Sequence, residues 1–200
     1  MGRGPGAHHA QRRAEFADAV LAIVAERGLA AVSQAEVAAQ AGISPGRVQH
    51  YFPAKRQLLE AAFEHGNELS SRRIQAKAGT DLQAAEPRLV LTTVLTELIP
   101  YDAATEAHMR VRQSFHAHAF AEEAIAARLR VLYTDFHQQM AELIARDQHA
   151  GRIPSDVNPE GTALALVALT EGLAAYVLTG VTLAVHAREQ VLEAIAALYR

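Results

Sequence analysis

The sequence of 200 residues predicts an all-α protein, with a small N-terminal three-helix unit followed by a larger helical bundle. Beyond residue 60, Ala, Leu, Glu and Arg recur at spacings of three and four, whereas the two-residue alternation typical of strands is scarce. In the first third, serines suited to helix starts and glycines suited to helix ends follow one another closely. Both observations favour helices along the chain.

The first predicted helix covers residues 12–27 and ends at Gly28, which can adopt the left-handed conformation without steric cost. We expect its apolar face in the core of the N-terminal unit; this face consists of Phe16, Val20, Ile23 and Val24. Residues 1–10 are rich in glycine and include two histidines, and we expect a disordered tail there.

The second predicted helix covers residues 34–41. Ser33 and Glu36 have the spacing of a capping box, in which the serine oxygen accepts from the third backbone N–H and the glutamate reaches back to the cap. The helix therefore begins at about Gln34. Gly42 is suited to ending it.

The third predicted helix, residues 45–51, opens within a few residues of the second. Ser44 is its N-cap, and Pro45 suits the first helical position, where a missing N–H loses nothing. So sharp a turn makes the two helices cross. Val48 and Phe52 are expected to face inward, which leaves a face of donors, acceptors and an aromatic ring: Arg47, Gln49, His50 and Tyr51.

The remainder of the chain predicts six further helices, at about 54–77, 87–99, 103–117, 122–149, 159–180 and 186–199. Turn-forming residues separate them at Gly79-Thr80, Pro100, Gly151 to Pro154, Asn158-Pro159 and Gly180. The helix of 54–77 connects the N-terminal unit to the rest, so we expect it to act as a lever between them.

This arrangement is that of a helix-turn-helix, and residues from about 12 to 63 resemble the N-terminal domain of the TetR family of transcriptional repressors. The positions that carry the resemblance are Gly28, Ser33, Ala41-Gly42-Ile43-Ser44, Gly46, Tyr51-Phe52, Lys55 and Leu58-Leu59. Two positions depart from the usual pattern: Gln49 replaces a frequent Tyr, and Val37 replaces a frequent Ile. The resemblance implies a dimeric, ligand-responsive regulator that binds a palindromic operator.

Individual side chains suggest how this N-terminal unit, the head of the molecule, binds double-stranded DNA. Arg47 can pair in bidentate fashion with guanine and Gln49 with adenine, so we expect these two to read bases. His50 and Tyr51 are expected to contact bases or phosphate, and Lys55 phosphate. The full set of expected DNA contacts is Gln34, Ser44, Gly46, Arg47, Gln49, His50, Tyr51 and Lys55.

Charge divides the chain in the same way. Residues 1–58 contain seven Lys and Arg against four Asp and Glu, a net charge of +3, whereas residues 59–200 contain twelve against eighteen, a net charge of −6. Basic side chains near phosphates release counterions, which favours binding of any sequence. We therefore expect a DNA-binding domain over 1–58 and an effector-binding and dimerisation domain over 59–200.

The stretch from Gly161 to Val185 is nearly all apolar and long enough to span a bilayer. Glu171 at its centre, several threonines and the lack of flanking basic clusters argue against a membrane span. A helix apolar on all sides must instead be buried on all sides. We therefore expect a homodimer formed through the helices at about 159–180 and 186–199.

The region between residues 87 and 176 is expected to hold the sensor for a small, mostly apolar effector. Candidate lining residues are aromatic rings, thioethers and imidazoles with one carboxylate: Met109, Phe115, His116, Phe120, Tyr133, Phe136, His137, Met140, Glu171 and Tyr176. Glu171 is expected to be paired, hydrogen-bonded or protonated, since an isolated buried charge is costly. It anchors either a cationic or hydroxylated ligand or the subunit interface.

Other classes find less support. The chain has no cysteine and therefore no disulfide or thiolate site. His116 and His118 are two residues apart and so do not share a helix face, as two metal ligands on one helix would. We expect neither a metal nor another cofactor. Glu122 and Glu123, or Glu106 near His108, lack a framing catalytic motif, and we expect no enzyme. The absence of an apolar leader favours the cytoplasm. An activator or co-repressor-dependent regulator, or a protein-interaction module, remains the alternative.

Overall fold

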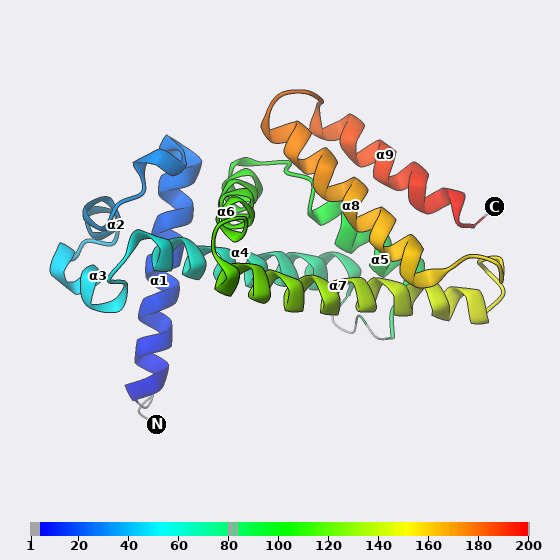
Figure 1. The fold of residues 1–200 in the computed structure, drawn as a ribbon, viewed down its shortest axis with the longest axis horizontal. Coiled ribbons are helices and arrows are strands. Elements are labelled where there is room, and N and C mark those ends of the chain that lie inside the picture. Colours follow the sequence, from blue (N-terminus) through cyan, green and yellow to red (C-terminus); the bar gives the residue numbers. More distant parts are fainter. Residues whose placement is uncertain (1–4, 80–81, 83, 200) are drawn as a thin grey trace. The chain divides into compact units, whose positions relative to one another are not determined.

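The computed structural model describes residues 5–79, 82 and 84–199. Its elements, in chain order (Figure 1), are α1 (Pro5–Arg27), the short 3₁₀ helix η1 (Leu29–Ala31), α2 (Gln34–Gln40), α3 (Pro45–Tyr51), α4 (Lys55–Ala78), α5 (Pro87–Glu97), α6 (Ala103–Ala119), α7 (Glu123–His149), α8 (Pro159–Leu178) and α9 (Ala184–Ala197). The described residues contain no strand, and the all-α prediction is confirmed.

The chain folds into two compact units. The first contains the residues up to Leu69 together with Asp102–Ala117, and the second contains Ser70–Tyr101 and the residues from His118 onward. α4 begins in the first unit and ends in the second. The contacts group residues 59–69 and most of α6 with the N-terminal helices, while a functional division after residue 58 stays a prediction.

The first unit is built around α1, against which η1 and α2 pack, while α2 and α3 pack against each other (Figure 1). The four α1 residues predicted for the core are all buried, and they are joined there by Val37, Val48 and Phe52. Burial of a Val, Ile or Phe side chain contributes about 1.5–3 kcal/mol relative to exposure. Hydrophobic burial therefore holds the short helices in place, because helices as short as α2 and α3 are not stable alone.

The start of α1 differs from the prediction. The helix begins at Pro5 instead of residue 12, so residues 5–10 are helical and not a disordered tail; residues 1–4 lie outside the described residues. Proline suits the first helical position. A tertiary contact also supports this turn, because the ring of His9 stacks on the ring of Tyr51.

The second unit is a bundle in which α7 packs against α5 and α8, and α8 packs against α9 (Figure 1). Its core contains Leu91, Leu95, Ile144, Val167 and Val191. The last helices follow the predicted bounds closely, with α8 ending at Leu178 and α9 beginning at Ala184.

Two carboxylates are fully buried in the second unit. The side chain of Glu97 pairs with Arg73 and, at 2.6 Å, with the Nζ of Lys77. The carboxylate of Asp147 accepts from Arg152 and, at 2.6 Å, from the hydroxyl of Tyr199. Pairing offsets the cost of removing these charges from water.

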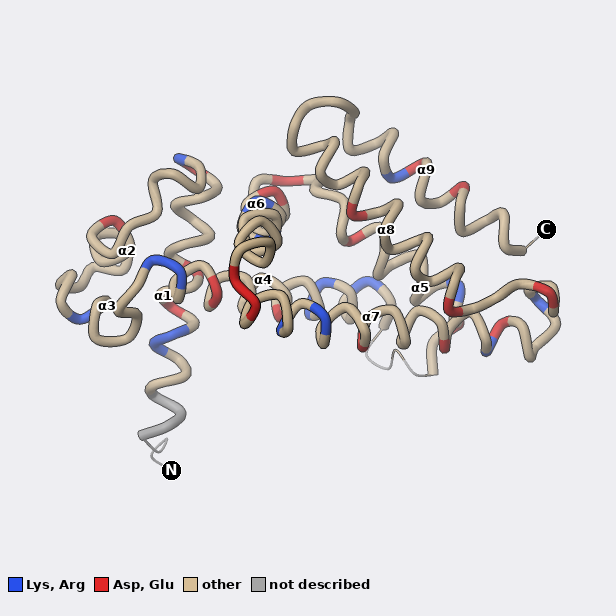
Figure 2. Tube along the Cα trace, in the orientation of Figure 1, with Lys and Arg blue, Asp and Glu red and all other residues tan. Residues whose placement is uncertain are grey.

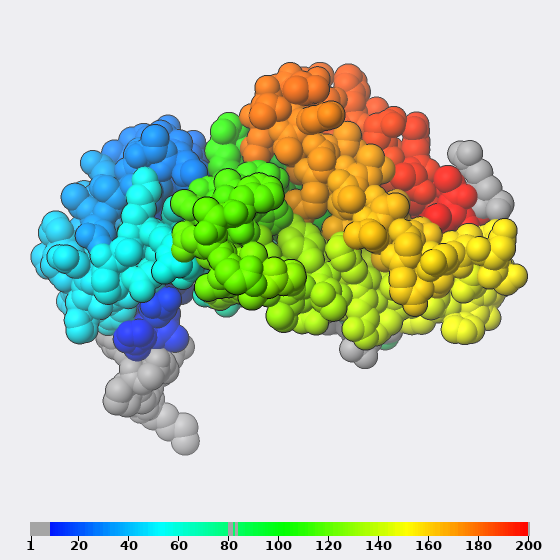
Figure 3. All heavy atoms as spheres, viewed as in Figure 1, coloured from blue at the N-terminus to red at the C-terminus, as the bar shows by residue number. Residues whose placement is uncertain are grey.

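α8 is the one helix of the described residues that is long and apolar enough to cross a membrane by length and composition, a property it shares with core helices of soluble proteins. In the single chain it is largely uncovered. Leu164, Leu169 and Tyr176 are exposed, and Val181 and Leu183 follow them in the turn toward α9. Figure 3 shows atoms of α8 and α9, from yellow through orange to red, at the surface of the second unit.

Candidate nucleic-acid interface and ligand site

The outward face of α3 carries the side chains expected to read bases. Arg47, Gln49 and His50 are exposed, whereas Val48 and Phe52 are fully buried beneath them. The buried pair fixes the rotation of the helix, since turning it by one residue would expose both apolar side chains. The predicted inward face of α3 is therefore confirmed, and the outward face is confirmed for Arg47, Gln49 and His50, whereas Tyr51 is half-buried.

The turn between α2 and α3 forms as the sequence suggests. Gly42 has a φ of 67°, the left-handed conformation, and its neighbour Ile43 donates its N–H to the carbonyl of Ala38 at 2.9 Å. Ser44 is extended, and its carbonyl accepts from the N–H of Arg47 at 3.0 Å. Within the described part of the chain the Ser44 hydroxyl makes no capping bond, so it faces solvent at the start of α3.

Contacts within the head change the expected roles of two polar side chains. Ser33 accepts from the N–H of Glu36 at 3.1 Å, but the Glu36 carboxylate pairs with Arg27 at 2.6 Å instead of completing the capping box. The side-chain amide of Gln34 donates to the carbonyl of Phe52 at 2.7 Å and so ties α2 to the end of α3. Because this side-chain amide is already bonded, the donor that Gln34 can offer to a phosphate is its backbone N–H in the first turn of α2.

Tyr51 lies at the centre of a ring cluster. It contacts Phe16 edge-on with 5.3 Å between ring centroids, and it also contacts His9 and His50. The ring is half-buried, so it both packs against α1 and reaches the surface. His9 was missed by the sequence reasoning, because no local pattern signals a contact between residue 9 and residue 51.

Basic side chains recur on the elements around this face. Figure 2 shows Lys and Arg positions early in α1, in α3 and at the start of α4. Lys55 is exposed at the first residue of α4. Arg12 pairs with Glu15 at 2.7 Å, and the guanidinium of Arg13 lies 4.5 Å from the ring centroid of Phe52. Helix termini, backbone amides and cations of this kind are the groups that bind phosphates.

The residues expected to line an effector site fall into both units. Met109, Phe115 and His116 belong to the first unit, where Phe115 is buried and its ring stacks on Phe63 at 4.6 Å. The second unit holds the others: Phe120, Tyr133, Phe136, His137, Met140, Glu171 and Tyr176. Each remains a prediction as a ligand contact.

The candidate effector-site residues also differ in how far their side chains are exposed. Met109 and Met140 are buried and serve as core residues. Phe120 is 93% exposed and Tyr176 is 54% exposed, so neither lies in an enclosed site of the single chain. Met140 also lines an open groove between α5 and α7 with Val90 and Val94.

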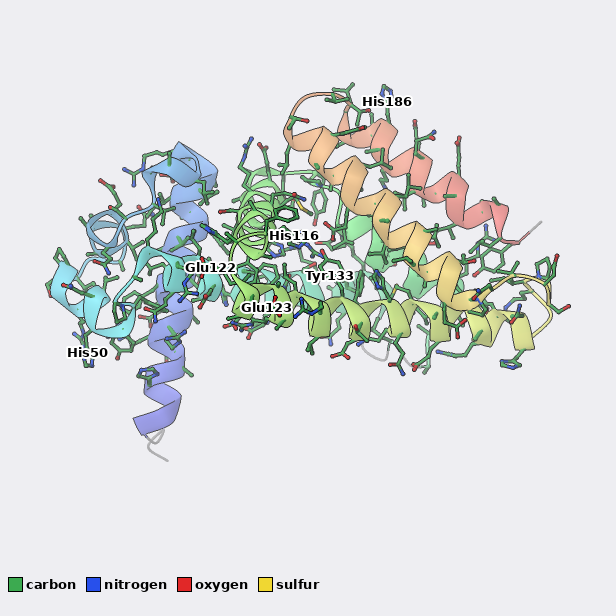
Figure 4. All side chains as sticks on the ribbon, in the orientation of Figure 1. His50, His116, Glu122, Glu123, Tyr133 and His186 are labelled. Atoms are coloured by element: carbon green, nitrogen blue, oxygen red, sulfur yellow. The ribbon has the colours of Figure 1, made fainter. Side chains whose placement is uncertain are left out.

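Glu171 and Tyr133 form the sharpest polar contact of the set. The hydroxyl of Tyr133, which Figure 4 labels on α7, donates to Oε1 of Glu171, on α8, at 2.9 Å. The ring of His137 lies one turn along α7, 5.8 Å from that of Tyr133. A carboxylate that accepts from a phenol hydroxyl is also suited, by its charge and its acceptor oxygens, to organic cations and to hydroxyl groups.

The carboxylates considered for catalysis have ordinary partners. Glu123 pairs with Arg130, Glu106 pairs with Arg110 at 2.5 Å, and Glu122 lies 3.9 Å from His118. Nε2 of His108 lies 3.1 Å from the amide oxygen of Asn67. Among the described residues, no group of three His, Asp or Glu side chains is placed to hold a metal ion.

Two family models match the chain. Residues 17–62 match the model described as bacterial regulatory proteins, tetR family, and residues 87–200 match the model described as BetI-type transcriptional repressor, C-terminal. Among curated relatives, the HTH-type transcriptional regulator PksA of Bacillus subtilis (strain 168) is 28% identical over 166 residues, which cover 83% of this chain and 78% of PksA.

Solved structures share the fold over nearly the whole chain. A putative TetR-family transcriptional regulator from Rhodococcus sp. aligns with a TM-score of 0.78 and 27% identity, covering 96% of this chain and 100% of that one. A putative transcriptional regulator from Saccharomonospora viridis, solved in complex with choline, aligns with a TM-score of 0.80 and 22% identity, covering 94% and 96%. This protein belongs to the TetR family of transcriptional regulators.

Proposed function

We propose that this regulator is a repressor that binds a palindromic operator in double-stranded DNA as a homodimer and is released by a small organic effector. One observation carries the DNA-binding part: α3 presents Arg47, Gln49 and His50 to solvent while Val48 and Phe52 lock it into the head. A polar helix on a rigid support is the geometry that enters a major groove. As a DNA-binding regulator, the protein acts in the cytoplasm.

The residues divide by the chemistry of their side chains. Arg47 and Gln49 read bases, because a guanidinium matches guanine and an amide matches adenine in bidentate fashion. Backbone or side-chain donors position the phosphates: Gln34, Ser44, Gly46, His50, Tyr51 and Lys55. A Cβ placed at Gly46 would meet no neighbouring atom of the described residues within 4 Å, so the backbone there is open to a close approach by DNA.

The experiment that tests DNA binding is selection of duplexes from a random pool by the full-length protein, with the double variant Arg47→Ala/Gln49→Ala as control. An enriched palindrome that disappears with the double variant supports the proposal. Each lost bidentate contact is expected to cost about 1–3 kcal/mol in discrimination. No enrichment, or enrichment unchanged in the variant, contradicts it.

The homodimer is supported by the uncovered apolar surface of α8 and α9. A hollow between these helices is lined by small and apolar residues from both, among them Ala165, Leu169, Ala194 and Leu198. A second copy related by a two-fold axis covers this surface with its own α8 and α9. Light scattering at micromolar concentration is expected to give the mass of a dimer, and a monomer there contradicts the proposal.

The effector site is supported by the contact between Tyr133 and Glu171. We place a small, mostly apolar organic molecule beside these residues, with a cationic or hydroxyl group near the carboxylate. Small organic cations, choline included, are the first compounds to test by calorimetry. Glu171→Gln is expected to weaken binding of cations while the protein stays folded, whereas unchanged binding with a weaker dimer assigns Glu171 to the interface.

Release of DNA requires that the effector bind the DNA-incompetent conformation more tightly than the DNA-competent one. α4 is the continuous helix shared by the two units and is therefore the expected lever. Because coupling between sites is reciprocal, operator DNA must weaken effector binding by the same factor by which effector weakens DNA binding. Unequal factors, measured in one buffer, contradict this mechanism.

A further inference from the structure

We propose that His9 is an additional phosphate-binding residue of the DNA interface, and that protonation of this imidazole strengthens DNA binding as the pH falls. The inference rests on the proposed function and deepens it, because it adds a residue and a form of regulation to the same surface. It begins from a contact between the start of α1 and the end of α3.

The ring of His9 stacks on the ring of Tyr51, with centroids 4.8 Å apart and planes inclined by 28°. The stack holds the imidazole beside the helix expected to enter the major groove. His9 is nonetheless exposed, so its ring nitrogens remain open to a solvent-side partner. An exposed histidine in a flexible tail would lose more conformational entropy on binding than one already held by a ring contact.

A second imidazole lies against the same tyrosine. His50 meets the Tyr51 ring edge-on at 5.7 Å, with planes at 89°, and it lies on the outer side of α3 (Figure 4). Tyr51 therefore has one histidine from α1 and one from α3 as ring neighbours. Both histidines are exposed, and His50 belongs to the surface that faces DNA in the proposed function.

The charged residues next to His9 along α1 are Arg12, Arg13 and Glu15, followed by Asp18, which pairs with His65. α3 contributes Arg47, and the first turn of α4 contributes Lys55 and Arg56. The Glu15 carboxylate is already paired with Arg12. A phosphate backbone brought against this surface thus meets cations, and it becomes the main source of negative charge near the two imidazoles.

The direction of the pH effect follows from linkage. An imidazole has an unperturbed pKa of about 6.5, and its protonated form has donors on both nitrogens. A nearby phosphate favours the charged form, so DNA binding takes up protons and affinity rises as the pH falls through this range. Each additional phosphate that a cation neutralises also steepens the dependence of log affinity on log salt concentration by about 0.9.

The test uses the full chain and fluorescence anisotropy. Binding of the selected duplex, and of an unrelated duplex of the same length, is measured from about pH 8 to about pH 5.5, which brackets the imidazole pKa. The wild type is expected to gain several-fold in affinity at the acidic end. His9→Phe keeps a ring for the stack with Tyr51 but cannot be protonated, so it is expected to lose part of this gain.

Matched controls separate His9 from other titrating groups. His149→Gln changes an exposed histidine of the second unit and is expected to leave the pH dependence intact. His50→Gln in the His9→Phe background is expected to remove most of the remaining gain. The first unit contains a buried histidine, His65, that pairs with Asp18. Circular dichroism at each pH therefore checks that the head stays folded.

The two proposals fail in different ways. If neither duplex binds at any pH, the DNA-binding function and this inference are both overturned. If the duplexes bind but His9→Phe keeps the full pH dependence and the wild-type salt dependence, only the role of His9 is overturned.

Discussion

The two units bury similar aliphatic and aromatic side chains but leave opposite kinds exposed. Around α3 the first unit presents Arg47, Gln49 and Lys55, while along α8 the second unit presents Leu164, Leu169 and Tyr176. The first surface gains most from a charged partner that releases counterions, and the second gains most from an apolar partner that removes it from water. Two surfaces of one small chain are thus suited to two different partners.

The largest effect is expected from a charge placed on the apolar surface. Leu169→Glu puts a carboxylate at the α8 and α9 hollow, and a two-fold axis would bury it twice. Because an unpaired buried charge costs about 3–5 kcal/mol, we expect the dimer dissociation constant to rise more than about a thousandfold, measured by sedimentation.

The mirror control places the same charge on the other surface. Gln49→Glu is expected to abolish operator binding by repelling phosphates while leaving the dimer intact. If Leu169→Glu leaves the dimer intact, the contrast between the two surfaces no longer holds.

The next effect concerns buried charge in the second unit. Glu97→Ala removes the buried carboxylate and leaves Arg73 and Lys77, whose side chains are partly exposed and can reach water, so we expect the free energy of unfolding to fall by about 1.5–3 kcal/mol. Glu106→Ala in the first unit breaks an exposed pair with Arg110 and is expected to cost at most about 1 kcal/mol. Urea unfolding of both variants measures the difference, and equal losses would contradict it.

A smaller effect is expected where two helices of the first unit approach closely. A Cβ added to Gly66 on α4 would lie 2.1 Å from Cδ2 of His108 on α6, a ring that is itself buried. We expect Gly66→Ala to lower the free energy of unfolding by about 1–3 kcal/mol, as overpacking does. Gly46→Ala, in the open α3, is the control and is expected to be neutral or stabilising by up to about 1 kcal/mol in thermal unfolding.

The smallest effect is a difference in pH sensitivity between the units. Partial burial and the hydrogen bond to Asp147 raise the pKa of the Tyr199 phenol. The folded state therefore disfavours phenolate, so stability is expected to be full below about pH 10 and to fall as the pH rises above that value. The slope should stay well under about 1.4 kcal/mol per pH unit, because the side chain is partly exposed.

Tyr199→Phe is expected to flatten this alkaline slope in thermal unfolding at a series of pH values. The same substitution should leave the acidic response of DNA binding, assigned to His9 in the first unit, unchanged. An alkaline slope that persists at full size in Tyr199→Phe would assign it to other groups.

Much of the fold was predictable because helix ends are local. Ser44 and Pro45 start α3 at the predicted residue, and Gly42 ends the preceding helix in the left-handed conformation. Spacing also indicated that Val48 and Phe52 face inward, since one side of a helix repeats every three to four residues. These features depend on neighbours within a turn or two.

Pairings between distant residues were not predictable in the same way. Gln34 donates to a carbonyl eighteen residues away, and the capping box at Ser33 is only half made because Arg27 pairs with Glu36. The early start of α1 goes with the stacking of His9 on Tyr51. No short-range pattern encodes these partners, because they meet only after the helices have packed.

By itself, the sequence determined the all-α class, the bounds of most helices and the inward face of α3, because periodicity and capping act over a few residues. Only the tertiary structure decided that Glu171 pairs with Tyr133, that Phe120 lies exposed, and that α6 groups with the N-terminal helices. Those outcomes depend on packing between residues far apart in the chain, where many arrangements satisfy the same hydrophobic pattern and only shape and polar pairing distinguish them.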